Sequence, residues 1–241
     1  MISKLSLTII PNFEEGEVLL INKELDWTSF DVVNSIKAFL KYELGIKKIK
    51  IGHAGTLDPK ATGLMIICTG KQTKSIEKYQ SLDKEYTGSF TLGQTTPSWD
   101  TETTPNQNFP IDHITEKMIY DITNRFIGTI LQRPPSYSAI WIDGRRAYKI
   151  ARKDNKFKLE PRQVEISEFE IVSVKIPQVK FRIRCSKGTY IRALANDFGK
   201  ALNSGAYLSS LCRSAIGHFK LEEALSINEF KERYKNPEEE W

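Results

Sequence analysis

The chain has 241 residues, a formal net charge of +5, 40% apolar residues and 10% aromatic residues. This composition is typical of a globular protein with a buried core, and it excludes an intrinsically disordered chain. No run of about 18 apolar residues occurs, and the N-terminus lacks the zones of a signal peptide. We therefore expect a cytoplasmic protein that does not engage a membrane.

The cysteines and histidines do not form a metal-binding pattern. The chain contains three of each, without a CxxC pair and without zinc-ligand spacing. We expect the thiols to lie in or near the core, and we expect no metal. The residues concerned are Cys68, Cys185 and Cys212, with His53, His113 and His218.

The first part of the chain predicts a strand, a helix and a second strand. Glu17 to Asn22 is a short apolar run typical of a buried strand. Thr28 and Asp31 have the spacing of a capping box, which predicts that a helix begins there. An apolar face continues that helix until Gly45. The apolar run from Gly63 to Thr69 has the length of a buried strand.

A glycine-containing loop precedes this second strand. Residues 52–59 read Gly-His-Ala-Gly-Thr-Leu-Asp-Pro and present the carboxylate of Asp58 beside the imidazole of His53. The glycines permit close approach to the backbone, and Pro59 keeps Asp58 out of helical geometry. The loop could hold Asp58 still for chemistry, but Asp-Pro is also a common turn former. The loop alone leaves both interpretations open.

The later part of the chain mixes strands and helices. Apolar and polar residues alternate from Tyr86 to Leu92 and from Val179 to Cys185, which predicts two half-exposed strands. The polar segment from Gly93 to Pro110 is expected to be a long surface loop or an insertion. Helices are predicted from Thr115 to Phe126 and from Thr189 to Leu202. Because no regular βαβ alternation occurs, we expect an α+β fold with a largely antiparallel sheet.

Basic residues concentrate in two stretches. One, from Ile46 to Lys50, leads into the Asp58 loop, and the other runs from Arg145 to Lys158 against the single acid Asp154. On a helix, part of the second stretch would form one stripe suited to a phosphate backbone. A solvated helix face is the alternative.

Three further residues suggest a site for a flat polar ring. Tyr86 opens a predicted strand, and Tyr190 and Arg192 lie at a predicted strand-to-helix junction. An arginine keeps a nearby carboxylate ionised, and tyrosine faces stack on rings. With Asp58, these residues suit a nucleobase whose neighbouring sugar carbon gains positive charge. Each residue could instead have an ordinary packing or surface role.

Four motifs in order resemble the TruB family of tRNA pseudouridine synthases. The loop at residues 52–59 and the residues that follow it resemble the catalytic motif of that family. The other resembling segments are residues 84–86, the stretch between residues 134 and 152, and Ser186 to Arg192, with Leu92, Gly93, Thr95 and Asp100 between them. The residues after the catalytic loop that carry the resemblance are Ala61, Gly63, Gly70, Thr73 and Lys74.

The resemblance implies a pseudouridine synthase fold and activity. The fold would be α+β, with a mixed, mostly antiparallel sheet flanked by helices, in one catalytic domain over residues 1–241 with an RNA-gripping insertion at about 131–158. The enzyme would flip uridine 55 out of the TΨC arm of tRNA and isomerise it to pseudouridine without a cofactor. Asp58 would either attack the sugar carbon or remove a sugar proton. We expect a monomer without an obligate protein partner.

The resemblance also assigns residues to roles. Asp58 is the implied catalytic residue, and Arg192 is expected to pair with it. The implied substrate contacts are His53, Tyr86, Tyr190, Arg192 and Leu211, with Leu211 and Arg213 on the strand that closes the pocket. The implied RNA contacts are Lys23, Asp100, Arg145, Arg146, Lys149 and Arg152.

The chain departs from the family pattern in places. Residues 23–29 correspond to the family motif Lys-Pro-x-Gly-x-Thr-Ser, but this chain has neither the proline nor the glycine of that motif. Trp141 stands where the family usually has a lysine. Many relatives end in a PUA-type RNA-binding domain. After Phe219 only a short helical stretch and an acidic tail follow, so we expect no PUA domain here.

Two other functions are compatible with these features. The chain could act chiefly as an RNA-binding folding aid for tRNA, in which case Asp58 would be dispensable. It could also be the catalytic subunit of a guide-RNA-dependent particle, although the expected lack of a PUA domain disfavours that role.

Overall fold

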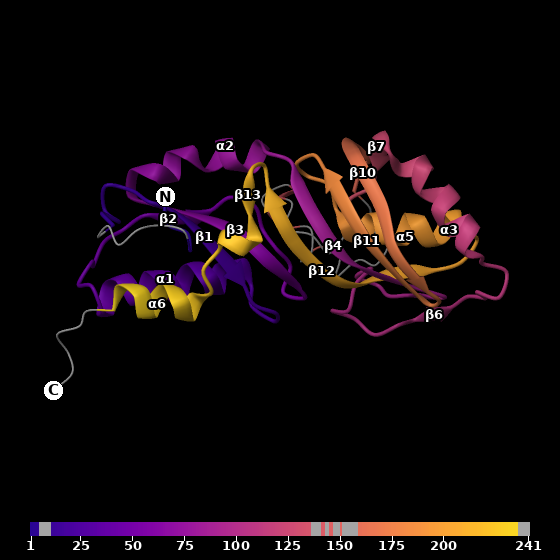
Figure 1. The fold of residues 1–241 in the computed structure, drawn as a ribbon, viewed down its shortest axis with the longest axis horizontal. Helices are drawn as coiled ribbons and strands as arrows, with labels where there is room; N and C mark the ends of the chain where they lie inside the picture. Colours follow the sequence, from indigo (N-terminus) through magenta and orange to yellow (C-terminus); the bar gives the residue numbers. More distant parts are fainter. Residues whose placement is uncertain (5–10, 136–140, 143–144, 147–149, 151–158, 236–241) are drawn as a thin grey trace. The chain divides into compact units, whose positions relative to one another are not determined.

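The structure, a computed structural model, describes residues 1–4, 11–135, 141–142, 145–146, 150 and 159–235. For residues 141–142 and 145–146 the backbone alone is described. The chain divides into two compact units (Figure 1). The terminal unit comprises Met1–Glu85 and Cys212–Trp241, and the central unit comprises Tyr86–Leu211.

The terminal unit contains a sheet with the strand order β1-β3-β12, in which β2 also pairs with β3 and β13 with β12. The pairs β1–β3, β2–β3 and β12–β13 are antiparallel. The elements are β1 (Val18–Lys23), α1 (Ser29–Tyr42), β2 (Ile51–His53), β3 (Ala61–Thr69), η1 (Gly70–Ser75), α2 (Ile76–Ser81), β12 (Ala206–Ile216), β13 (Phe219–Lys220), η3 (Leu221–Glu223) and α6 (Ile227–Tyr234).

Helices cover both faces of this sheet (Figure 1). On one face, Val18 and Leu20 belong to a buried cluster against which Ile76 of α2 packs. On the other face α1 and α6 lie side by side, where the rings of Phe39 and Phe230 meet edge to face with centroids 5.5 Å apart. Because β3 is buried along nearly its whole length, it provides a rigid support for the loop that precedes it.

The central unit contains strands in the order β12-β4-β11-β10-β7. The pairs β10–β11 and β7–β10 are antiparallel. Its elements are β4 (Lys84–Leu92), β5 (Gln94–Thr95), β6 (Gln107–Asn108), α3 (Glu116–Thr123), η2 (Asn124–Phe126), β7 (Gly128–Gln132), β8 (Trp141–Ile142), β9 (Arg145–Arg146), β10 (Arg162–Lys175), β11 (Gln178–Cys185) and α5 (Ile191–Ala201). In sequence, β4 and β12 each run from one unit into the other.

Aromatic side chains form the core of the central unit. Phe90 of β4 packs against Phe181 of β11, with ring centroids 4.3 Å apart, and against Phe198 of α5 at 5.4 Å. Phe169 of β10 packs against the same Phe198 at 5.7 Å. Large aromatic rings bury much apolar area, so this cluster anchors α5 on the sheet.

The expected elements are found close to their predicted bounds. The capping box is confirmed: the Thr28 hydroxyl accepts from the Asp31 N–H, and the Asp31 carboxylate accepts from the Thr28 N–H. The α1 helix ends at Tyr42, earlier than predicted, although Gly45 does adopt a left-handed φ of 68°. No helix in the described part of the chain is long and apolar enough to cross a membrane.

Two segments contain short strands that the sequence did not predict. The segment from Gly93 to Pro110, expected to be a long surface loop or an insertion, contains the short paired strands β5 and β6. Arg145, which the predicted helical stripe included, instead forms β9 together with Arg146, and β9 pairs with β8. The backbone at Arg145 is therefore extended rather than helical.

Candidate active site

The Asp58 loop connects β2 to β3 in the terminal unit. It is closed by a hydrogen bond of 3.0 Å from the Ala61 N–H to the Asp58 carbonyl. At its start the Ala54 N–H donates to the Ile66 carbonyl at 2.9 Å, which ties the loop to β3. Asp58 is half-buried, so its side chain is held by the fold and still open to a ligand.

The turn between β1 and α1 and the first residue of α1 brace the loop on both sides of Asp58. The buried Ser29 hydroxyl accepts from the Leu57 N–H at 2.8 Å and donates to the Leu57 carbonyl at 3.0 Å. The Asp26 N–H donates to the Pro59 carbonyl at 2.9 Å. The residues before and after Asp58 are therefore both fixed, one to the start of α1 and one to the turn before it, which limits the freedom of the carboxylate between them.

Asp26 explains how this turn forms without the glycine of the family motif. Its φ is 65°, in the left-handed region that glycine adopts most easily and that aspartate tolerates better than most residues. Its carboxylate pairs with Lys60 at 2.6 Å. The turn therefore adopts a left-handed conformation at Asp26, which stands where the family motif has glycine.

Lys23 lies beneath the same turn and is 0% exposed. Its ammonium donates to the carbonyls of Trp27 at 2.6 Å, Glu24 at 2.9 Å and Pro59 at 3.4 Å. Burial lowers the pKa of Lys23 to about 8, and the nearby Asp58 carboxylate partly opposes this shift. The side chain thus stabilises the backbone around Asp58 and adds positive charge near it.

Arg213 supports the loop from β12. It is 1% exposed, and its guanidinium donates from Nε to the Leu64 carbonyl at 2.7 Å and from Nη2 to the Gly55 carbonyl at 3.1 Å. A Cβ on Gly63 would lie 2.5 Å from the Arg213 carbonyl oxygen, and Gly63 has a φ of 110°. Only glycine therefore allows β3 to pass this closely.

His53 precedes the loop and is half-buried. Burial, followed by the positive charge of Arg213, lowers the pKa of His53 below its usual range. The imidazole is therefore mainly neutral at neutral pH. A neutral ring can fill space next to a nucleobase without the cost of burying a charge.

Arg192 and Asp100 form a buried ion pair in the central unit. The distance from Arg192 Nε to Asp100 Oδ2 is 3.4 Å, and 4% of each side chain is exposed. The Arg192 guanidinium also donates to the Ser98 carbonyl at 3.2 Å. The predicted pairing of Arg192 with Asp58 would join residues of the two units and stays a prediction.

Tyr86, Tyr190 and Leu211 also lie in the central unit. Tyr86 is 9% exposed on β4, Tyr190 is half-buried directly before α5, and Leu211 is half-buried on β12. Their contacts with a substrate stay predictions. Within each unit the described geometry is thus specific: the terminal unit gathers His53, Asp58, Lys23 and Arg213, and the central unit gathers Arg192 and Asp100.

Two of the implied RNA-contact residues are buried. Lys23 is fully buried with its ammonium bonded to carbonyls, and Asp100 is 3% exposed and paired with Arg192. Both groups have partners inside the fold, and their contacts with RNA stay predictions. Lys149 and Arg152 lie outside the described residues, and for Arg145 and Arg146 the backbone alone is described.

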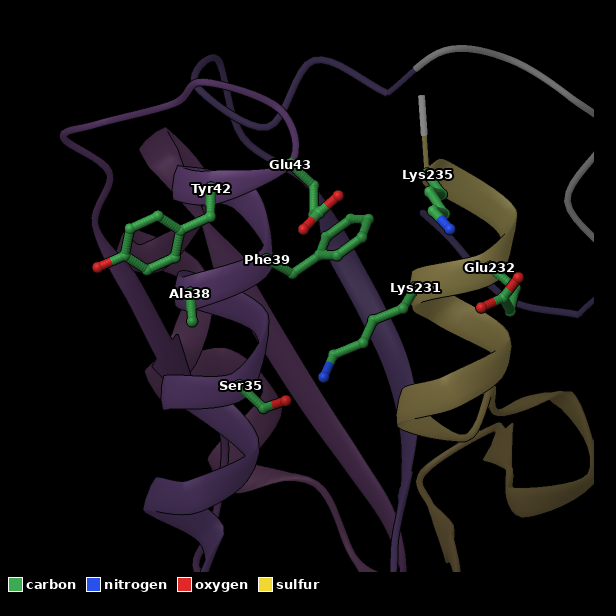
Figure 2. A pocket seen from close by; sticks show the side chains of 8 residues that line it. All are labelled: Ser35, Ala38, Phe39, Tyr42, Glu43, Lys231, Glu232 and Lys235. Carbon is green, nitrogen blue, oxygen red and sulfur yellow. The ribbon is translucent and has the colours of Figure 1, made fainter. Parts of the chain in front are cut away.

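A surface groove of about 360 Å³ lies between α1 and α6, and none of its lining residues is a candidate site residue (Figure 2). Figure 2 shows Lys231 reaching from α6 toward α1, with the Phe39 ring between the two helices. The groove is lined by Ser35, Ala38, Phe39, Tyr42, Glu43, Lys231, Glu232 and Lys235. In the part of the chain that the structure describes, no three His, Cys, Asp or Glu side chains gather in a way that could hold a metal ion.

The family model described as "TruB family pseudouridylate synthase (N terminal domain)" matches residues 41–191, well over half of the chain. The chain belongs to the TruB family. The match includes the Asp58 loop, Tyr86, Asp100 and Tyr190, and it ends one residue before Arg192. Membership makes this chain a pseudouridine synthase, which is an isomerase, and the enzyme class predicted from the motifs is confirmed.

Curated TruB-family relatives are similar over almost the whole chain. The tRNA pseudouridine synthase B of Phocaeicola vulgatus is 52% identical over 221 residues, which cover 92% of this chain and 94% of that protein. The protein of the same name from Flavobacterium johnsoniae is 52% identical over 219 residues, which cover 90% of this chain and 96% of the relative.

Solved structures confirm the pseudouridine synthase fold for this TruB-family chain. An H/ACA RNP bound to a substrate RNA containing 2'-deoxyuridine includes a chain with a TM-score of 0.66 and 26% identity. A Cbf5-Nop10-Gar1 complex includes one with a TM-score of 0.69 and 27% identity. Each match covers 91% of this chain, but 53% and 54% of those longer chains, so this chain spans about half of their length.

Proposed function

We propose that this TruB-family enzyme isomerises uridine 55 in the TΨC arm of tRNA to pseudouridine. The names of relatives that are 52% identical over at least 90% of the chain support tRNA as the substrate. The observation that carries the proposal is the brace around Asp58, in which Leu57 is bonded to Ser29 at the start of α1 and Pro59 to Asp26 in the turn before it. This support favours a role for the carboxylate in chemistry at a sugar carbon over a role as a simple turn former.

The reaction rearranges one substrate and requires no other reactant. The bond from N1 of uracil to the sugar carbon C1' breaks, the ring turns over, and C5 bonds to C1'. C5 then loses its proton and N1 gains one, so the atoms balance. The Asp58 carboxylate can stabilise the positive charge that develops at the sugar, as carboxylates do in glycosidases. Attack at C1' and removal of a sugar proton both require this carboxylate beside the sugar.

The target base must leave its stack in the RNA to reach Asp58. Flipping costs about a few kcal/mol, which stacking and hydrogen bonds to the base edge can recover. In the proposal Tyr86 and Tyr190 provide the stacking faces. The neutral ring of His53 fills the gap left in the RNA, since its lowered pKa keeps it uncharged. Leu211 adds an apolar wall.

The basic stretch after residue 144 is proposed to grip the RNA backbone. Arg145, Arg146, Lys149 and Arg152 are the residues concerned. Replacing Arg145 and Arg146 by Ala should weaken tRNA binding and lower the salt slope by about one unit for each phosphate contact that is lost. An unchanged slope would assign these arginines to a solvated surface.

Substitution of Asp58 tests the central claim. We expect Asp58→Asn to yield no pseudouridine on an unmodified tRNA transcript when the product is mapped by position. Binding of the transcript should change little, because amide and carboxylate have the same shape. The matched control is Asp112→Asn, an exposed aspartate, which should keep wild-type activity. Full activity of Asp58→Asn would overturn the mechanism.

The same assay separates the other functions. Activity of the purified chain on a bare transcript supports an enzyme that requires neither a guide RNA nor a protein partner, as expected for a monomer. A different result would instead favour an RNA-binding folding aid. In that case the wild type would form no pseudouridine but would accelerate tRNA folding, and Asp58→Asn would accelerate it as well.

A further inference from the structure

Tyr190 is held by the side chain of a residue 58 positions away in the sequence. The Tyr190 N–H donates to Gln132 Oε1 at 2.7 Å, and Gln132 Nε2 donates to the Tyr190 carbonyl at 3.1 Å. Gln132 is 1% exposed. A buried amide is costly unless its donor and acceptor are both satisfied, and here one backbone residue satisfies both. The side-chain amide of Gln132 thus takes the place of a backbone residue in a neighbouring strand, which would make the same two hydrogen bonds with Tyr190.

Arg162 holds the same segment from a second direction. Its Nη2 donates to the Gly188 carbonyl at 2.6 Å, and its guanidinium lies over the Tyr190 ring, 5.1 Å from the centroid. A guanidinium in this position is attracted to the ring face. Gly188 has a φ of 81°, and a Cβ there would lie 3.4 Å from Arg162 Nη2. The backbone of Tyr190 and its ring are thus restrained by different residues.

The sheet places these two residues together. Arg162 and Gln132 are directly paired at the end of the ladder between β10 and β7. Gln132 is the last residue of β7 and Arg162 is the first residue of β10, so both lie on regular strands. Side chains on strands can position a neighbouring group more accurately than side chains on loops.

We propose that Gln132 and Arg162 are positioning residues that fix Tyr190 for the flipped uracil. Tyr190 directly precedes α5, which begins at Ile191 and carries Arg192, so the same restraint sets where that helix starts. Neither residue needs to touch the substrate. This inference rests on the proposed function, because it assumes that Tyr190 faces the uracil.

A kinetic double-mutant cycle between Gln132 and Tyr190 tests this role. Gln132→Leu removes both hydrogen bonds and keeps a similar volume. We expect the single-turnover rate on a tRNA transcript to fall by about 10- to 100-fold, since a displacement near 1 Å can cost about 100-fold. The dissociation constant for tRNA should change by less than about 2-fold, because the substitution does not remove a phosphate contact.

The cycle distinguishes positioning from general destabilisation. If Gln132 acts through Tyr190, Gln132→Leu in a Tyr190→Ala background should lower the rate no further than Tyr190→Ala alone. Rate losses that multiply would overturn the proposal. The matched control is Gln163→Leu, an exposed glutamine next to Arg162 on β10, which should keep wild-type rates.

Arg162 provides a second and milder variant. It is half-buried, so Arg162→Met is expected to fold even if circular dichroism shows that Gln132→Leu does not. The same pattern is expected: a lower rate that is not additive with Tyr190→Ala. Wild-type rates for the Gln132 and Arg162 variants would refute the positioning role but leave the proposed function intact. A wild-type enzyme that makes no pseudouridine would refute the proposed function itself.

Discussion

Arg192 and Asp100 form an ion pair that is almost fully removed from solvent, with a distance of 3.4 Å from Nε to Oδ2. Asp100 Oδ1 also accepts from the Glu102 N–H at 2.9 Å, which fixes the orientation of the carboxylate. A buried arginine needs a counter-charge, because isolated charges are strongly disfavoured in the protein interior. Asp100 therefore determines where the Arg192 guanidinium can lie.

Removal of this counter-charge should destabilise the central unit. We expect Asp100→Ala to lower the free energy of unfolding by about 3 kcal/mol, as for other buried pairs that lose one partner. Urea denaturation measures this change, and pseudouridine formation should fall with it. Asp112→Ala, at an exposed position, is the control and should leave stability nearly unchanged. Equal stability of the two variants would contradict a structural role for the pair.

Ser29 should prove essential for the rigidity of the Asp58 loop. Ser29→Ala leaves the buried N–H and carbonyl of Leu57 without their hydroxyl partner, which should cost about 2 kcal/mol. The rate should also fall, because the residue before Asp58 is no longer fixed. Ser35→Ala on the same helix provides the comparison. A normal rate for Ser29→Ala would show that this brace is not needed for catalysis.

The left-handed backbone conformation of Asp26 predicts which substitutions at this position the protein tolerates without loss of stability. Asp26→Gly should keep the stability within about 0.5 kcal/mol, because relief of backbone strain offsets the loss of an exposed ion pair. Asp26→Val should lose about 2 kcal/mol, because a β-branched residue disfavours a positive φ. Thermal or urea unfolding measures both changes. Similar losses for glycine and valine would mean that the Lys60 ion pair, rather than the backbone, determines stability at this position.

Lys23 predicts a dependence of stability on pH. Its pKa in the folded chain is about 8, whereas an unfolded lysine titrates near 10.4. Between these values the unfolded chain binds more protons, so the contribution of Lys23 to the free energy of unfolding rises with pH, by at most about 1.4 kcal/mol per pH unit. Below about pH 8 both states are protonated and the contribution is constant.

Comparison with Lys23→Met isolates this effect. The difference in the free energy of unfolding between wild type and Lys23→Met should stay constant from about pH 6.5 to 7.5 and then shift in favour of the wild type toward about pH 9.5. Urea denaturation at each pH gives the difference. A difference that does not change across the whole range would show that the buried ammonium titrates normally.

Local patterns in the sequence were sufficient for the elements and for the family. The capping box at Thr28, the apolar run that became β3 and the alternation in β4 and β11 each involve residues within a few positions of one another, so neighbouring side chains decide the outcome. The Asp58 loop was recognisable for the same reason. Its eight consecutive residues combine glycine freedom, a proline and a carboxylate.

Only the tertiary structure decided which side chains support that loop and its partners. Arg213 reaches Gly55 across 158 positions, and Gln132 reaches Tyr190 across 58. Lys23 and Asp100 were expected at the RNA but proved to be buried. A charged side chain looks the same in a sequence whether it meets solvent or a carbonyl. Its role depends on which distant strands enclose it, and that is set by packing of the whole unit.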